Sequence, residues 1–314
     1  MVGRWPMNIG ATGEGLSCAL PLESLRRHAF LVGASGSGKT VLGKVIVEES
    51  IAKRLPVIAI DLQGDLTALA LRPDDDPHAH VFVERVEPKI WTPASKVGIP
   101  ITAARLDIDE LFGLYEGGPA SHGKARLSII SLVGLDDDER DRFIASLCVA
   151  LHRWMLTLDG ESPWGLLYLD EVAPYLPPVR NPASKEPLML LMRQARKYGL
   201  CCLLATQSPG DIDYKALGQV GTIAIGKLST PQELRKVEPH LSAYGASREL
   251  LAALPRKRPG EFVLLSDEHP EPVEFKARQT YTPHRLVGSD EIRRLVTDQD
   301  RIELGGLHSL REVG

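Results

Sequence analysis

The sequence lacks several features that define whole classes of protein. Only four cysteines occur in 314 residues, namely Cys18, Cys148, Cys201 and Cys202, and none has the spacing of a metal-ligand set. This excludes a disulfide framework and favours a reducing compartment, with Cys201 and Cys202 as buried, inert thiols in an apolar run. No apolar run approaches the about 18 residues of a membrane helix, and no leader pattern opens the chain, so we expect a cytoplasmic protein without membrane contact.

An excess of positive charge is also absent. The formal net charge is −4, so no overall basic field indicates nucleic acid, although a ring can concentrate positive charge on one inner surface. There is no internal repeat and no low-complexity tract. Hydrophobic residues make up 43% and charged residues 25% of the chain, which excludes long disorder. The length fits one large α/β domain, or one domain with a sizeable insertion.

What the sequence does contain is a phosphate-binding loop. Residues Gly33 to Thr40 read GASGSGKT and match G-x-x-x-x-G-K-[ST] at every fixed position. Gly36 and Gly38 permit backbone angles that a side chain would forbid, so successive N–H groups can face a triphosphate. The apolar run 28–32 before the loop predicts a strand, and the apolar spacing of 41–46 after it predicts a helix, whose N-terminal dipole favours phosphate.

This context gives the loop residues their expected roles. Lys39 can reach the β and γ phosphates, and the Thr40 hydroxyl can bind Mg²⁺. The sequence therefore predicts a site for a nucleoside triphosphate and Mg²⁺. The residues expected to contact the nucleotide are Gly33, Ser35, Gly36, Ser37, Gly38, Lys39, Thr40 and Val41.

Strand and helix patterns alternate along the chain. Apolar runs predict strands at 28–32, 57–60, 81–83, 127–133, 166–169, 200–205, 222–225, 261–265 and 273–275. Helical patterns run to about 54, from 136 to 155, around 188–195, over 234–254 with breaks, and over 290–296. The alternation predicts an α/β fold whose mainly parallel sheet is covered by helices on both faces. Because the strand at 127–133 lies between them in sequence, the strands at 28–32 and 166–169 need not be neighbours in the sheet.

The sequence pattern divides the chain into three parts. Residues 1–27 are expected to be a lead-in of turns with at most an edge strand, 28–278 the main domain, and 279–314 a polar C-terminal tail that is loose apart from one helix. Residues 72–126 are interrupted by prolines, and we interpret them as an insertion or an elaborated crossover.

Polar residues follow several predicted strands directly, and the carboxyl ends of parallel strands meet at one edge of a sheet. Asp170 and Glu171 follow the strand at 166–169, where Asp170 can hold Mg²⁺ and Glu171 can deprotonate the attacking water. Gln207 follows a further strand and can hydrogen-bond that water or the γ-phosphate. The alternative for Asp170 and Glu171 is a helix cap. Asp61 also follows a strand and is the second candidate for the metal.

Arg196 and Lys227 are candidates for a different role. Phosphoryl transfer leaves charge on the γ-phosphate oxygens, and a cation that reaches them raises the rate by orders of magnitude. Neither residue follows the phosphate loop, so a neighbouring subunit could supply them. The alternative is that Arg193, Arg196 and Lys197 form a solvated helix face. The basic cluster at 256–258 receives no role, since such a cluster is usually an exposed turn.

Taken in order, five segments resemble the HerA/FtsK group of P-loop ATPases. The resemblance spans about residues 8–276. The segments are Gly33–Thr40, Asp61–Asp65, Asp170–Glu171, Arg196–Gly199 and Ala205–Pro209. The A-T-Q-x-P strand end that follows the R-K-x-G turn is far more specific than the phosphate loop, which occurs in many NTPases.

The resemblance implies a P-loop NTPase fold of the additional-strand (RecA-like) type over 28–278, and ATP as the nucleotide. It implies Glu171 as the catalytic base, Gln207 as the sensor, and Arg196 and Lys227 as cations that reach the nucleotide of the neighbouring subunit. It further implies a homo-hexameric ring that moves DNA or proteins by ATP hydrolysis, and our first hypothesis is that the substrate is double-stranded DNA. The acidic net charge keeps open an alternative, an ATP-gated scaffold that activates a partner such as a nuclease or another defence effector.

Overall fold

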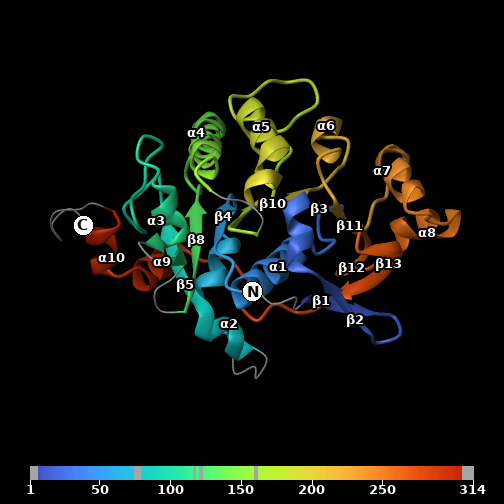
Figure 1. Cartoon of the computed structure of the whole chain (residues 1–314), viewed down its shortest axis with the longest axis horizontal. Coiled ribbons are helices and arrows are strands. Elements are labelled where there is room, and N and C mark those ends of the chain that lie inside the picture. The colour runs from blue at the N-terminus through green and yellow to red at the C-terminus, as the bar shows by residue number, and fades with distance from the viewer. Residues whose placement is uncertain (1–5, 74–78, 116–117, 120–122, 159–161, 306–314) are drawn as a thin grey trace.

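The computed structural model describes residues 6–73, 79–115, 118–119, 123–158 and 162–305 (Figure 1). Parts of the predicted lead-in (1–5), insertion (74–78, 116–117 and 120–122) and tail (306–314) therefore lie outside the described residues. Eleven strands of the described chain form one sheet in the order β2-β1-β13-β12-β11-β3-β10-β9-β4-β8-β5. An α/β fold with a mostly parallel sheet is thus confirmed.

Seven strands form the parallel part of this sheet, from β11 to β5. Their bounds are β3 Ala29–Val32, β4 Val57–Asp61, β5 Val86–Trp91, β8 Ala125–Ser131, β9 Gly165–Leu169, β10 Leu200–Thr206 and β11 Thr222–Ile225. All except β5 are buried along their whole length, which explains their continuous apolar runs. As expected, β3 and β9 are not neighbours, but the strand between them is β10, not the strand at 127–133.

The remaining four strands extend the sheet as an antiparallel meander beside β11. These strands are β12 Glu261–Ser266, β13 His269–Ala277, β1 Met7–Thr12 and β2 Ser17–Leu20. The lead-in is therefore more regular than its turn-rich sequence suggests: two of its segments pair with each other, and β1 also pairs with β13. A short separate hairpin joins β6 Leu114–Tyr115 to β7 Gly118–Pro119.

Helices flank the sheet on both sides (Figure 1). The α-helices are α1 Lys39–Ala52, α2 His80–Arg85, α3 Ile108–Phe112, α4 Asp137–Met155, α5 Lys185–Ala195, α6 Tyr214–Leu217, α7 Pro231–Ala243, α8 Arg248–Ala253, α9 Ser289–Leu295 and α10 Asp298–Glu303. Short 3-10 turns are η1 Leu22–Arg27, η2 Leu66–Ala70, η4 Arg196–Tyr198 and η5 Leu254–Arg256. Helix α4 begins where its acidic residues predicted, because Asp136 and Glu139 form a capping box there. No helix among the described residues has both the length and the apolar character needed to cross a membrane.

Two details of the 72–126 region differ from expectation. Residues 81–83 lie in helix α2, not in a strand, and of its side chains only Phe82 is buried. Three apolar residues, Val81, Phe82 and Val83, are too short a run for the sequence pattern to distinguish a helix from a strand. The following strand β5 includes Pro88, although proline was expected to interrupt this region. Because β5 is the edge strand and Pro88 itself pairs only with Leu127 of β8, the missing N–H of Pro88 leaves no ladder bond broken; the bridge from Trp91 to Ile99 lies further along the strand.

The C-terminal residues differ most from the expected loose tail. After β13 the chain crosses the molecule to α9 and α10, beside β5 at the opposite edge of the sheet (Figure 1). Asp300 of α10 forms an ion pair with Lys89 of β5 at 2.6 Å, and Arg301 donates to the Val97 carbonyl at 2.8 Å. The helix predicted at 290–296 is confirmed as α9, and the segment that precedes it passes the phosphate loop helix α1.

Candidate nucleotide site

The phosphate loop connects β3 to α1, and contacts from neighbouring strand ends hold it in place. Its Ala34 N–H donates to the Lys227 carbonyl at 2.8 Å, and its Ser37 carbonyl accepts from the Gly260 N–H at 2.9 Å. Gly36 and Gly38 adopt φ values of 75° and 95°, the left-handed region that glycine tolerates best. The loop therefore has the conformation that its glycines predicted.

A cavity of about 380 Å³ opens in front of this loop at the carboxyl edge of the parallel strands. Its lining residues come from six separate segments. They are Ser35, Gly36, Gly38, Lys39, Thr40, Val41, Gln63, Asp65, Asp170, Glu171, Gln207, Pro259 and His284. The other two predicted contact residues, Gly33 and Ser37, belong to the same loop but are buried and are not among the described residues that line the cavity. A Cβ at Gly33 would lie 2.7 Å from the Ser37 hydroxyl, so Gly33 is required for packing.

Lys39 occupies the position expected of a phosphate ligand at the start of α1. Its Nζ donates to the carbonyl oxygens of Gly33 at 2.7 Å and Ala34 at 3.3 Å. Burial lowers the pKa of Lys39, whereas the nearby carboxylates of Asp170 and Glu171 oppose that shift. These loop carbonyls satisfy the amine, and a phosphate oxygen could replace them without leaving a buried charge unpaired.

The predicted metal ligands are already in contact. The Thr40 hydroxyl donates to Asp170 Oδ2 at 2.8 Å, and the hydroxyl of Tyr168 donates to Asp170 Oδ1. A hydroxyl oxygen and a carboxylate oxygen at this separation are suitable ligands for Mg²⁺, which prefers oxygen and retains several waters. The residues present therefore fit the ion that the sequence predicted.

Glu171 and Gln207 lie at the ends of neighbouring strands, β9 and β10, and both line the cavity. Glu171 Oε1 accepts from the Ala173 N–H at 3.3 Å and from the Thr206 hydroxyl at 3.2 Å. Burial raises the pKa of Glu171, and these two hydrogen bonds oppose the shift. Glu171 is thus an oriented carboxylate of raised basicity, which suits a group that takes a proton from water.

Two predicted cations lie outside the cavity. Arg196 precedes β10 by four residues, and since that strand spans about 20 Å, Arg196 lies at the opposite sheet edge from Gln207. It lies near His28, at the amino end of β3, and its side chain is exposed. Lys227 adjoins the phosphate loop of its own chain through its carbonyl, with an exposed side chain. The structure does not bring these two residues together.

Asp61, the second metal candidate, has a structural role. Its carboxylate is buried and accepts from the N–H groups of Gly64 and Thr67 and from the Thr67 hydroxyl, all within 2.7 Å. Gln63 and Asp65 are the residues of this segment that line the cavity. Burial, together with the charges of Asp170 and Asp61, raises the pKa of Asp65 to about 6.

Sequence reasoning missed three further lining residues: Gln63, Pro259 and His284. Gln63 lies inside a segment that the family resemblance already included. Pro259 follows the basic cluster at 256–258, whose Lys257 forms an ion pair with Glu274 at 2.8 Å. His284 comes from the C-terminal segment, which has no periodic pattern that could have indicated its position.

Comparison with known proteins agrees with this site. Residues 7–127 match the family model described as Helicase HerA, central domain, a segment that includes the phosphate loop and Asp65. The match confirms the resemblance to the HerA/FtsK group over this part of the chain, which contains two of the five short segments, Gly33–Thr40 and Asp61–Asp65. No curated protein matches the sequence.

Solved structures extend the likeness to most of the chain. The bacterial conjugative coupling protein TrwBΔN70 has a TM-score of 0.58 at 12% identity, covering 91% of this chain and 92% of that one. VirB4 of Thermoanaerobacter pseudethanolicus gives 0.52 at 10% identity, covering 87% and 96%. The genome packaging NTPase B204 of Sulfolobus turreted icosahedral virus 2, in complex with AMPPCP, gives 0.50 at 15% identity, covering 81% and 99%. At these identities the likeness shows a shared fold.

Proposed function

We propose that this chain, a P-loop ATPase of the HerA/FtsK type, is a Mg²⁺-dependent motor that assembles into a hexameric ring and moves DNA. The observation that carries the hydrolytic part is the placement of Glu171. Its carboxylate lines the same cavity as Lys39 and is held in position by two hydrogen bonds. In this role Glu171 takes a proton from the attacking water, while Gln207 hydrogen-bonds that water or the terminal phosphate.

The charges around the cavity support dependence on Mg²⁺. Asp65, Asp170 and Glu171 line it, whereas Lys39 is the one lysine or arginine among its described lining residues. A triphosphate adds several further negative charges. Mg²⁺ held by Thr40 and Asp170 would neutralise part of that charge on the phosphates.

The presence of a single lysine or arginine, Lys39, among the described lining residues also supports an oligomer. Since Arg196 is exposed at the far edge of the sheet, it cannot reach the nucleotide of its own chain, yet it could reach that of a neighbour. An arginine supplied in this way stabilises the charge that develops on the γ-phosphate. In a head-to-tail ring two different surfaces of neighbouring chains meet, and we propose that this edge faces the nucleotide site of the next chain.

DNA as the substrate rests on family membership and on the genome packaging role named for B204. The direct test measures ATP hydrolysis by the purified protein with and without duplex DNA, together with its native mass. We expect duplex DNA to stimulate hydrolysis several-fold and the mass to correspond to six chains. ATP hydrolysis that duplex DNA leaves unchanged, from a protein of monomer mass, would contradict the motor.

The second candidate is an ATP-gated scaffold that activates a partner enzyme, and the net charge of −4 favours it. The two functions differ in what they need from hydrolysis. In a scaffold, Glu171→Gln leaves ATP-dependent assembly with the partner intact, whereas in a motor it stops movement of DNA. Loss of assembly whenever turnover is blocked would count against the scaffold.

A further inference from the structure

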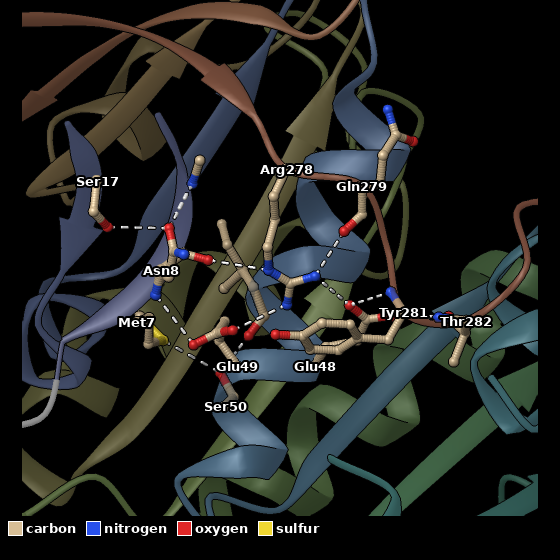
Figure 2. A network of polar contacts seen from close by, with 12 residues as sticks. Met7, Asn8, Ser17, Glu48, Glu49, Ser50, Arg278, Gln279, Tyr281 and Thr282 are labelled. Atoms are coloured by element: carbon tan, nitrogen blue, oxygen red, sulfur yellow. Dashed lines mark hydrogen bonds and ion pairs between the residues drawn. The ribbon is translucent and has the colours of Figure 1, made fainter. Parts of the chain in front are cut away.

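Several charged residues of the phosphate loop helix α1 are buried, so the helix requires partners of opposite charge or hydrogen-bond partners for them. Glu48 is fully buried and Glu49 is 7% exposed, so both carboxylates need partners. One partner is Arg278, which follows β13. Its Nη1 lies 2.9 Å from Glu48 Oε2 and its Nη2 lies 3.0 Å from Glu49 Oε1 (Figure 2).

The residues after Arg278 complete the coordination of Glu48. The N–H groups of Tyr281 and Thr282 donate to its carboxylate at 3.0 and 2.9 Å, and the Thr282 hydroxyl donates at 2.9 Å. The ring of Tyr281 lies against the Arg278 guanidinium, 3.9 Å from its central carbon (Figure 2). We name residues 278–287 the C-terminal strap. These contacts fix one end of the strap on α1.

The other end of the strap reaches the nucleotide cavity. The Val287 N–H donates to the Gly64 carbonyl at 3.1 Å, next to Asp65, and His284 lines the cavity. His284 Nδ1 lies 3.4 Å from the Nζ of Lys44, a buried residue one helical turn beyond Thr40. The strap thus connects the C-terminal end of α1 to the side of the cavity where Asp65 lies.

The neighbouring lysine determines which ring nitrogen of His284 carries a proton. An ammonium group can only donate, so Nδ1 accepts from Lys44 and the proton resides on Nε2. Burial, with the charge of Lys44, lowers the pKa of His284, which keeps the ring neutral at pH 7. Among the described residues, Nε2 has no hydrogen-bond partner, and it remains available as a donor.

We infer that His284 is a nucleotide-contacting residue, brought to the site by the C-terminal strap, whose Nε2–H donates to an anionic oxygen of the bound triphosphate or to a metal-bound water. The inference rests on the proposed ATP site and adds a residue to it. It also assigns the strap a function: Arg278, remote from the cavity, positions His284 through the backbone between them.

The test measures binding of a fluorescent ATP analogue at equilibrium, with Mg²⁺ and with EDTA. We expect His284→Ala to weaken binding by roughly tenfold, the usual loss for one hydrogen bond to a charged ligand. His284→Gln should retain most of the affinity, because its amide nitrogen can occupy the position of Nε2. A loss that persists in EDTA identifies a phosphate oxygen as the acceptor, and a loss confined to Mg²⁺ identifies a bound water.

The matched control is Arg285→Ala. Arg285 neighbours His284 and is likewise exposed, but it is not among the described residues that line the cavity and it forms an ion pair with Glu291, so its loss should leave nucleotide affinity unchanged. Equal affinity of the wild type and His284→Ala would overturn the inference while leaving the ATP site in place. Failure of the wild type to bind, matched by Lys39→Ala, would instead overturn the ATP site and the inference together.

Hydrogen exchange gives a second readout, and its main measurement is made on the wild type. Addition of Mg²⁺ and the ATP analogue to the wild type should slow exchange of the amides in residues 281–287 several-fold. The same addition to Lys39→Ala should leave them unchanged. Exchange in the strap that is insensitive to the nucleotide in the wild type would contradict a direct contact with His284.

Discussion

Tyr168 of β9 donates its hydroxyl hydrogen to Asp170, which directly follows the strand, and Asp170 also accepts from Thr40 on α1. The tyrosine is fully buried, and space for its hydroxyl exists because α1 carries Gly43 at the point of closest approach. A Cβ at Gly43 would lie 2.0 Å from the Tyr168 hydroxyl oxygen. Packing between the helix and the strand therefore sets the position of the carboxylate that we assign to the metal.

Removing the Tyr168 hydroxyl should leave the Asp170 carboxylate less firmly positioned without unfolding the protein. We expect Tyr168→Phe to cost about 1–2 kcal/mol of unfolding free energy, since Asp170 loses one of its two hydrogen-bond donors. The Mg²⁺ concentration for half-maximal ATP hydrolysis should rise several-fold. Urea unfolding and a Mg²⁺ titration measure the two effects, and an unchanged titration would show that Tyr168 has no part in orienting Asp170.

Gly43→Ala should act on the same contact from the other side. The added methyl group overlaps the Tyr168 hydroxyl, so either the ring or α1 must shift, at a cost of about 1–3 kcal/mol. Thermal unfolding measures this loss. Gly218→Ala is the matched control, because its Cβ would meet no atom closer than 3.6 Å. Similar melting temperatures for both variants would contradict the close approach at Gly43.

Glu171→Gln should separate nucleotide binding from hydrolysis. The amide keeps the shape of the side chain but cannot take a proton from water, so we expect kcat to fall by about 10²-fold or more while ATP affinity changes little. Lys39→Ala should instead abolish nucleotide binding or turnover, since Lys39 is the lysine of the phosphate loop. Steady-state hydrolysis and equilibrium binding distinguish the two variants. Wild-type turnover in Glu171→Gln would assign the base to another residue.

Strand ends and the phosphate loop could be predicted because their signals are local. Six of the eight expected loop residues line the cavity together with Asp170, Glu171 and Gln207, each directly after a buried apolar run. His284 and the strap could not be predicted in this way. Their position depends on charges at 48 and 49 of α1 and on a partner at 278, about 230 residues apart in sequence.

Placement of β5 and α2 shows the same limit in the 72–126 region. Residues 81–83 carry two β-branched side chains, and only the contacts of Phe82 with the core decide that they form a helix turn. Pro88 was interpreted as a break, yet the sheet edge tolerates it. Which strand lies at an edge is a property of the whole sheet, so no local pattern could have indicated it.

His28 should make stability depend on pH. Its Nε2 donates to the Met192 carbonyl at 2.8 Å and its Nδ1 accepts from the Cys202 N–H at 3.1 Å, so both ring nitrogens are occupied in the neutral form. Burial lowers the pKa of His28 from 6.5 to about 4, with the Met192 carbonyl opposing and Arg196 adding to the shift.

The direction of this dependence follows from which state binds the proton. Below pH 6.5 the unfolded chain protonates His28 and the folded chain does not, so stability falls as the pH decreases towards 4. Between pH 7 and pH 5 the contribution of His28 should be about 2 kcal/mol. Urea unfolding at both pH values should show a smaller decrease for His28→Gln than for the wild type. Equal decreases would contradict a buried neutral imidazole.

Arg196→Ala tests whether one chain completes the site of another. Because Arg196 lies at the far edge of its own sheet, we expect unchanged ATP affinity and a kcat reduced by about 10³-fold, the effect of losing an arginine supplied in trans. Lys197→Ala, the exposed neighbour, is the control and should retain activity.

Mixing two inactive variants then decides where Arg196 acts. In a mixed assembly, a Glu171→Gln subunit still carries Arg196, and an Arg196→Ala subunit still carries Glu171, so some interfaces contain one intact copy of each. Hydrolysis by the mixture should therefore exceed that of either variant alone, and it should depend on the ratio in which they are combined. If Arg196 served only the stability of its own η4 turn, no ratio would restore activity, because every Arg196→Ala subunit would remain defective regardless of its neighbour.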